Sequence, residues 1–363
     1  MDLQNQVELA RRKIVKDGFD MSLGEIMRIY ERGELIINPE YQRLFRWDST
    51  RKTNFIESIL LNIPIPPIFV FTDETGKWEL IDGLQRLSTV FQFAGILRDA
   101  EGELVDKFVP NGTRLLPDLD NSEWSSDDEN TKILPLAIRL DMERVRLRVE
   151  ILKRESDAKA KYELFQRLNT GGASLSPQEV RNCVAVMLNK GFYSALSSMA
   201  EDANFVKTTD MTERAREEQK HNELVLRYLA YRYKTYDQAI DVHDWLDDIL
   251  IDIANNEKYP VQEESIIFAR TFNIINDALG VDAFKRYESG NFSGGFLISP
   301  YETITNGVSR NIDFVEKCGV EYLRNAVIRM WTDERFRANA RAGVRGSTRL
   351  GKVLPLVDEW FSK

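Results

Sequence analysis

The sequence of 363 residues is poor in cysteine and histidine, with two of each. Cys183 and Cys318 are far apart and show no metal-ligand spacing, so no zinc cluster is expected and a reducing cytoplasm is the predicted location. His221 and His243 both lie in stretches with helical patterning. Two such histidines are too few for most zinc sites and histidine-dependent nucleases, which makes those classes poor candidates.

Long apolar runs and a basic net charge are also missing. No segment approaches the roughly 20 apolar residues that a membrane-spanning helix needs, and Met1–Gln4 starts no apolar leader, so no membrane partner is expected. The net charge of −9 argues against a protein that coats nucleic acid without specificity, although it permits local basic patches. The ordinary apolar and charged content instead indicates a globular chain with room for two domains.

The patterning changes near residue 155. Before it, Val145–Ile151 alternates strictly between apolar and polar residues, which predicts a strand with one wet face. Ile68–Phe71 and Lys77–Ile81 predict a hairpin, because Asp73–Gly76 between them has turn composition. Helices are expected at 22–33, at 51–61 and from the Asp82-Gly83 pair to about Leu97, and the carboxylate-rich stretch 118–129 is expected to be a solvated insertion.

Beyond residue 155 the pattern is almost wholly helical. Ser176-Pro177-Gln178-Glu179 combines an N-cap, a first-turn proline and a glutamate, which predicts a helix that runs to Lys190 and ends at Gly191. Further helices are expected at 213–235, 239–255, 262–279, 300–317 and 320–340. The expected fold is therefore an α+β domain over residues 1–155 packed on a larger all-α domain over 156–363.

The first chemical motif is Asp82-Gly83-Leu84-Gln85-Arg86, at a predicted strand-to-helix junction. Free backbone N–H groups, the helix dipole and the Arg86 guanidinium suit a phosphate, and Asp82 would hold a metal ion. The alternative is an ordinary turn in which Asp82 only caps the helix.

The second motif lies in Asn38–Trp47 and concentrates amide, guanidinium and aromatic groups. Its candidate ligand-binding residues are Tyr41, Gln42, Arg43 and Arg46. The arginines would bind phosphates and an aromatic ring would stack on a base. In the alternative, the rings pack the core while the arginines reach along its surface to solvent.

The third motif is Phe165–Asn182, a predicted helix end, loop and helix start. Its candidate site residues are Asn169, Thr170, Gly171, Gly172 and Arg181. Adjacent glycines let a backbone approach a ligand closely. A plain helix–loop–helix corner would explain the glycines and the cap, but not the cluster of polar residues around them.

In this order and spacing, the three motifs resemble those of the domain of unknown function 262 family. That family supplies the N-terminal, ParB/sulfiredoxin-like domain of modification-dependent type IV restriction enzymes of the GmrSD kind and of related phage-defence proteins. The resemblance is close over residues 20–200 and loose beyond them. It implies a ParB/sulfiredoxin-like nucleotide-binding domain that hydrolyses a nucleoside triphosphate.

The resemblance also implies roles for individual residues. Asp82, Gln85 and Arg86 would be catalytic, with Asp82 holding Mg²⁺, and Gly83 would join the nucleotide-binding residues of all three motifs. The chain departs from the family at Leu84, where glutamine is usual. Leu84 belongs to an apolar helical stripe, whereas Gln85, Ser88 and Gln92 are expected on the polar face.

A second departure concerns nuclease chemistry. Restriction members of the family carry an HNH nuclease domain, for which this sequence offers no suitable histidine pair. The leading hypothesis is therefore a nucleotide-hydrolysing sensor or switch that works with DNA and a separate nuclease subunit, and that could also pair with copies of itself. The alternatives are a non-catalytic DNA-binding adaptor and, ranked last, a nickase with Asp82 and Glu40 as metal ligands.

A local reversal of charge sign lies near the C-terminal end of the sequence. The candidate DNA-binding residues there are Arg341, Arg345, Arg349 and Lys352. The residues from Arg341 to Lys352 are expected to form a flexible basic loop that contacts backbone phosphates. The alternative is that the arginines pair with acidic stretches 118–129 and 237–252 within the protein.

Overall fold

The computed structural model of the protein describes residues 3–5, 16–37, 47–73, 75–99, 101–153, 176–341 and 343–362. The chain divides into two compact units, Met1–Ser174 and Leu175–Lys363. No helix among the described residues has the length and apolar character that crossing a membrane requires.

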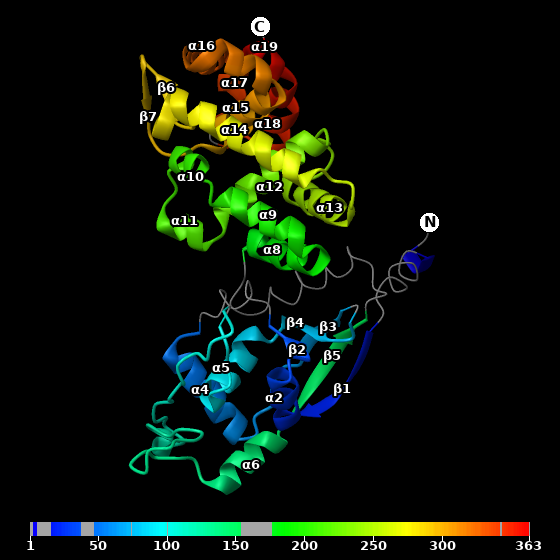
Figure 1. The fold of residues 1–363 in the computed structure, drawn as a ribbon, viewed down its shortest axis with the longest axis vertical. Coiled ribbons are helices and arrows are strands. Elements are labelled where there is room, and N and C mark those ends of the chain that lie inside the picture. Colours follow the sequence, from blue (N-terminus) through cyan, green and yellow to red (C-terminus); the bar gives the residue numbers. More distant parts are fainter. Residues whose placement is uncertain are drawn as a thin grey trace. The chain divides into compact units, whose positions relative to one another are not determined.

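The first unit is built on a mixed five-stranded sheet with the order β1-β5-β3-β4-β2 (Figure 1). Its strands are β1 (Lys16–Ser22), β2 (Leu35–Ile36), β3 (Ile68–Thr72), β4 (Trp78–Asp82) and β5 (Arg146–Leu152). β1 runs antiparallel to β5 and β3 antiparallel to β4, whereas the β3–β5 and β2–β4 pairs are parallel. The predicted hairpin is confirmed as β3–β4, and the predicted strand as β5.

The sheet has the burial that the alternation of β5 predicts. Leu147, Val149 and Ile151 are buried, while Arg146 and Arg148 are exposed. Polar residues on one face and apolar residues on the other place the core of this unit on the apolar face.

Four helices accompany the sheet in the described part of the first unit. They are α2 (Leu23–Glu31), α4 (Ser49–Leu60), α5 (Leu84–Ala94) and α6 (Leu136–Arg144). In Figure 1 α4 and α5 lie side by side, and α4 and α2 both contact α6. Ser22 caps α2 by accepting the Glu25 N–H at 3.3 Å, as the sequence predicts.

The predicted insertion at 118–129 is mostly exposed, as expected. It is held to the unit by Trp124, which is buried and packs edge-on against Phe93 of α5 at 5.8 Å between ring centroids.

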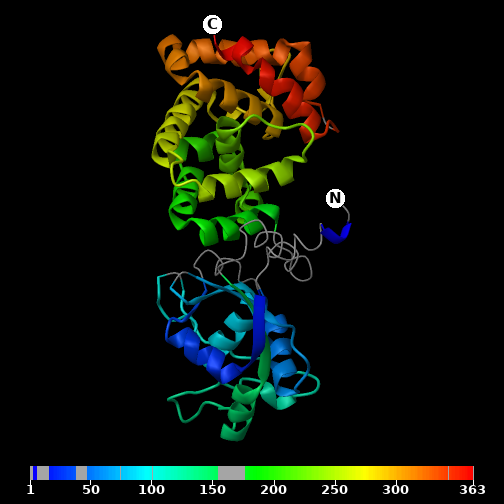
Figure 2. The same cartoon turned by 90° about the vertical axis from the view of Figure 1, so that its right-hand side faces the viewer.

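The second unit is mostly helical, and Figure 2 shows its helices stacked on one another. The helices are α8 (Pro177–Leu188), α9 (Lys190–Ala200), α10 (Ala203–Thr209), α11 (Glu213–Glu217), α12 (Lys220–Tyr233), α13 (Val242–Asn255), α14 (Val261–Leu279), α15 (Ile298–Arg310), α16 (Ile312–Thr332), α17 (Glu334–Asn339), α18 (Gly346–Val353) and α19 (Val357–Phe361). The expectation of an all-α region is wrong in one place, because β6 (Arg286–Glu288) and β7 (Asn291–Ser293) form a short antiparallel hairpin.

The helix that starts at the predicted capping box ends earlier than expected. Ser176 and Glu179 form the full box, but α8 stops at Leu188 and Gly191 lies inside α9. Asn189 causes the break: its backbone is extended and its side chain accepts the Phe192 N–H at 2.9 Å to cap α9.

Other predicted helices are also divided. The helix expected at 213–235 is broken at Gln219, whose φ of 60° is left-handed, into α11 and α12. The sequence predicts a break between residues 317 and 320. The structure has a kink of α16 there, at Gly319, and the ends of this helix lie at Asn311 and Asp333.

The core of the second unit contains a buried carboxylate shared by three helices. Glu302 of α15 is 1% exposed and accepts hydrogen bonds from Arg227 and Tyr231 of α12, at 3.0 and 2.9 Å. Arg349 of α18 binds its other oxygen at 2.8–2.9 Å. Burial and the Glu302 charge together raise the pKa of Tyr231, which keeps the phenol protonated as a donor. Because a buried charge is stable only when paired, this cluster determines how the three helices pack.

We predict that Glu302→Ala lowers the free energy of unfolding by about 3–5 kcal/mol, since it takes a buried acceptor away from the guanidinium groups of Arg227 and Arg349. Urea denaturation followed by circular dichroism measures this loss. The control is Glu316→Ala, which removes a surface pair with Arg270 and should cost less than about 1 kcal/mol. Equal losses in the two variants would contradict the central role of Glu302.

Candidate functional site

The candidate site is the corner where β4 ends and α5 begins. Gly83 forms the corner with φ 109° and ψ 6°, a left-handed conformation that favours glycine. A Cβ at this position would lie 2.6 Å from Cγ2 of Ile68 on β3, so the close approach of the strand also requires glycine. The strand-to-helix junction predicted from the sequence is therefore confirmed.

The Asp82 side chain does not cap α5, which starts without a side-chain cap. Its Oδ2 atom instead accepts a hydrogen bond from Arg86 at 2.6 Å. This ion pair spans one helical turn and is largely shielded, with the Arg86 and Asp82 side chains 14% and 26% exposed.

Arg86 has a structural role that the sequence alone does not reveal. Besides Asp82, its guanidinium donates to the carbonyl oxygens of Pro66 and Pro67, the second at 2.9 Å. These prolines belong to the connector between α4 and β3. Arg86 thus fixes the end of β4, the start of α5 and the chain that enters β3 relative to one another.

Gln85 joins the corner to the end of the second motif. Its Oε1 atom accepts the backbone N–H of Trp47 at 3.0 Å. Trp47 directly follows Arg46, and its ring packs edge-on against Phe55 at 5.4 Å. The next residue, Asp48, caps α4 by accepting the Arg51 N–H at 2.8 Å. The end of the second motif is therefore held next to the first motif.

A cation that the sequence analysis missed lies along the same polar face of α5. Lys52 of α4 donates from Nζ to Oε1 of Gln92 at 2.8 Å, and its ammonium lies 5.5 Å from the Phe108 ring centroid. Burial lowers the pKa of Lys52. The only sequence signal for it is its place on an amphipathic helix beside the motif, and that signal does not single out one lysine.

The polar face of α5 is narrower than the sequence predicts. Gln85 and Gln92 do lie on it, but Ser88 is 1% exposed and its hydroxyl has no hydrogen-bond partner among the residues that the structure describes. Leu84, where the family usually has glutamine, is half-buried, whereas Leu87 and Phe91 are fully buried.

The remaining nucleotide-binding candidates fall into two groups. Eight of them lie outside the described residues, namely Tyr41, Gln42, Arg43 and Arg46 of the second motif and Asn169–Gly172 of the third.

Arg181, by contrast, belongs to α8 of the second unit and is fully buried. It donates to Asp247 at 2.6 Å and to Gln178 at 3.3 Å, and its NH2 group lies 3.2 Å from Nδ1 of His243. These contacts explain the polar residues of the third motif around Arg181 as parts of a buried network. Its predicted contact with a nucleotide stays a prediction.

The predicted basic loop is a helix over much of its length. The expectation of a flexible segment from Arg341 to Lys352 is wrong because α18 covers Gly346–Val353. Arg349 binds Glu302. The alternative, in which the arginines pair with the stretches 118–129 and 237–252, is therefore wrong for Arg349. In the part of the chain that the structure describes, Arg341, Arg345 and Lys352 form no ion pair, and their contact with DNA stays a prediction.

The described residues contain no group of three or more histidine, cysteine or acidic side chains that could hold a metal ion. Asp82 therefore belongs to no such group in this part of the chain. Glu40, the second ligand of the nickase alternative, lies outside the described residues.

The segment that contains this corner is similar to a known protein domain. Residues 23–186 match the family model of the GmrSD restriction endonuclease N-terminal domain. All three motifs lie within this GmrSD-type segment, which begins at α2 and ends inside α8. No curated protein and no solved structure matches the chain. The resemblance to GmrSD proteins is thereby confirmed for this segment, while the ParB/sulfiredoxin-like fold stays a prediction.

We predict that Gly83→Ala destabilises the first unit more than Gly76→Ala does. Both positions have positive φ, 109° and 85°, which costs about 1–2 kcal/mol for any residue with a Cβ. A Cβ at Gly76 has nothing within 4 Å, whereas one at Gly83 clashes with Ile68. The clash should add about 1–3 kcal/mol, measured as the difference between the two urea midpoints. Equal midpoints would show that the corner can relax.

We predict that Arg86→Gln lowers the free energy of unfolding by about 2–3 kcal/mol, since hydrogen bonds from a charged donor to Asp82 and two carbonyls are lost. Arg51→Gln is the matched control, because Arg51 is 62% exposed and its pair with Asp48 spans 3.9 Å. Thermal unfolding of both variants measures the effect. If Arg86→Gln melts like the control, Arg86 does not hold the corner together.

Proposed function

We propose that the GmrSD-type segment binds a nucleoside triphosphate and acts as the sensor or switch of a restriction or phage-defence system. The hydrogen bond between Gln85 and Trp47 carries this proposal, because it holds Trp47, the residue that ends the second motif, next to the Asp-Gly-Leu-Gln-Arg motif. The match of this segment to a restriction endonuclease domain supports it.

In this proposal residues of both motifs act on the nucleotide. Arg43 and Arg46 bind the phosphates, the backbone at Gly83 approaches them, and Tyr41 contacts the base or sugar. Arg86 holds the Asp82 carboxylate in place and adds positive charge, and Gln85 positions the second motif and the attacking water. Phosphoryl transfer depends mainly on positioning and charge neutralisation, which these groups supply.

Magnesium fits this site as part of a nucleotide complex. One or two carboxylates are enough for Mg²⁺ when phosphate oxygens and water complete its coordination, and Asp82 supplies one. When bound, the ion would neutralise phosphate charge. A site made by the protein alone is not expected, because the described residues offer no metal-binding cluster.

A second candidate function is a non-catalytic adaptor that binds DNA. The observation that favours it is the mutual satisfaction of Asp82 and Arg86, together with the two proline carbonyls that Arg86 also binds. These groups satisfy one another, and Leu84 replaces the usual glutamine. Both features suit a corner that keeps its shape but does not hydrolyse a nucleotide. In both cases a separate nuclease subunit would cut the DNA.

We predict that the wild-type protein binds at least one of ATP, GTP, CTP and UTP in the presence of Mg²⁺, measured by titration calorimetry. Asp82→Asn should weaken this binding tenfold or more, which corresponds to about 1.4 kcal/mol. Asp141→Asn is the control, because Asp141 is 75% exposed on α6 of the same unit.

Phosphate release distinguishes the two functions. Release that requires DNA favours the switch, and binding without release favours the adaptor. If no nucleotide binds the wild type, or if both variants bind like the wild type, the proposed nucleotide site is wrong.

A further inference from the structure

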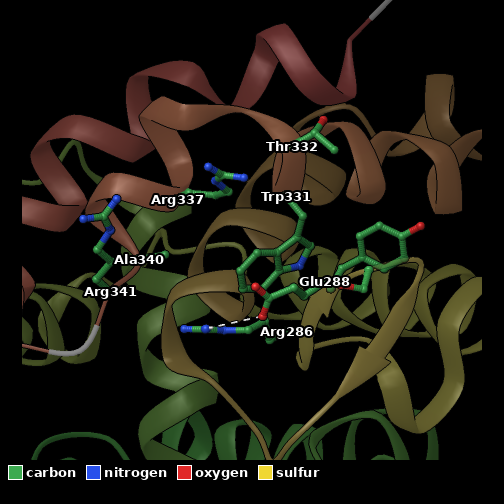
Figure 3. Close-up of a pocket in the computed structure, with 9 residues that line it drawn as sticks. Arg286, Glu288, Trp331, Thr332, Arg337, Ala340 and Arg341 are labelled. Atoms are coloured by element: carbon green, nitrogen blue, oxygen red, sulfur yellow. Dashed lines mark ion pairs between the residues drawn. The ribbon is translucent and has the colours of Figure 1, made fainter.

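A pocket of about 330 Å³ lies in the second unit, between the β6 end of the hairpin and the helices α16 and α17. Six of the side chains that line it are Arg286, Tyr287, Glu288, Trp331, Arg337 and Arg341. Figure 3 shows the Trp331 indole with Arg337 on one side and Arg286 on the other, and Arg341 at the edge. This pocket belongs to none of the three sequence motifs.

The pocket is built from rigid parts. Ser289 and Gly290 both have positive φ, 52° and 87°, as a tight two-residue hairpin turn requires, and they fix the adjoining strand β6. Trp331 is 5% exposed and packs edge-on against Phe336 at 5.0 Å. The Tyr287 ring rests on Phe292 at 4.9 Å. The positions of Trp331 and Tyr287 are therefore set before a ligand enters.

The charge of the lining is positive. It carries three guanidinium groups and one carboxylate, Glu288, which pairs loosely with Arg286 at 3.8 Å. Arg337 and Arg341 form no ion pair with any residue that the structure describes. Two of the three guanidinium groups are thus available to an anion, on a protein whose net charge is −9.

The Trp331 ring gives the cavity an aromatic wall. Trp331 lines the cavity together with the arginines, while its Nε1 atom is buried and has no hydrogen-bond partner among the described residues. The groups that the cavity offers to an anion are therefore the guanidinium groups.

We propose that this pocket binds a phosphate monoester on a nucleotide, whose oxygens accept hydrogen bonds from Arg337 and Arg341. The net charge of the lining is two positive, which matches the charge of about −1.5 to −2 of a phosphate monoester at neutral pH. One guanidinium group can bind two phosphate oxygens at once. The volume of this cavity lies at the lower end of the range for small-molecule sites. The ligand is either a free mononucleotide or the 5′-phosphorylated end of a DNA strand.

This inference is independent of the nucleotide site in the first unit, and the experiment keeps the two apart. The full-length protein is titrated by calorimetry with adenosine 5′-monophosphate, adenosine, and a short single-stranded DNA with and without a 5′-phosphate. We expect binding that requires the phosphate. Binding of both phosphorylated probes identifies a mononucleotide site, and binding of the phosphorylated DNA alone identifies a strand-end site.

Two variants and two controls assign the binding to the pocket. Arg337→Gln and Arg341→Gln should each weaken it tenfold or more. Arg214→Gln, at a side chain 86% exposed on α11, should leave it unchanged. Asp82→Asn should also leave it unchanged.

Several results would overturn the proposal. They are no binding of either phosphorylated probe at millimolar concentration, equal binding of the probes that lack phosphate, or unchanged binding in both arginine variants. Loss of binding in Asp82→Asn would assign the ligand to the first unit instead.

Discussion

The packing of the second unit depends on one buried carboxylate. Glu302 is shared by Arg227, Tyr231 and Arg349, so three helices meet at a single negative charge. Burial alone would raise the pKa of Glu223, but Arg227 and Lys220 lower it to about 2, which keeps a second carboxylate ionised beside the same arginine. The cluster also anchors α18, and with it the end of the basic segment. Charge pairing inside the unit therefore limits which arginines remain available to a ligand.

In the first unit, too, one charged group binds several partners. This group is the Arg86 guanidinium, which donates hydrogen bonds to Asp82, Pro66 and Pro67. Gly83 lets β3 pass close to the corner, and Gln85 holds the chain at Trp47. Binding sites work best when their groups are fixed before the ligand arrives, because ordering them on binding would cost affinity. The corner is a fixed support of this kind, whether or not turnover takes place on it.

The elements that could be predicted from the sequence are those whose signals are local. The alternation of β5, the turn at Asp73–Gly76 and the capping box at Ser176 each act within a few residues, and all three are present. The helix break at Asn189 could not be predicted in this way, because it depends partly on a hydrogen bond to the carbonyl of Ala254. The partners of Arg86 and Arg181 are equally distant in sequence. The three motifs could therefore be located from the sequence, but the contacts of their arginines could not.

The place where the GmrSD-type segment ends has a consequence for how such domains can be exchanged between proteins. The match stops at residue 186, inside α8, yet α8 packs against α9, α12 and α13 of the second unit. Arg181 lies in that last stretch and is fully buried against Asp247, which is beyond the match. A recombination event that moved only the matched segment would carry a buried positive charge away from its counterion. Such a segment can be inherited as a module only if the recipient supplies a helical unit with an acidic residue in the place of Asp247.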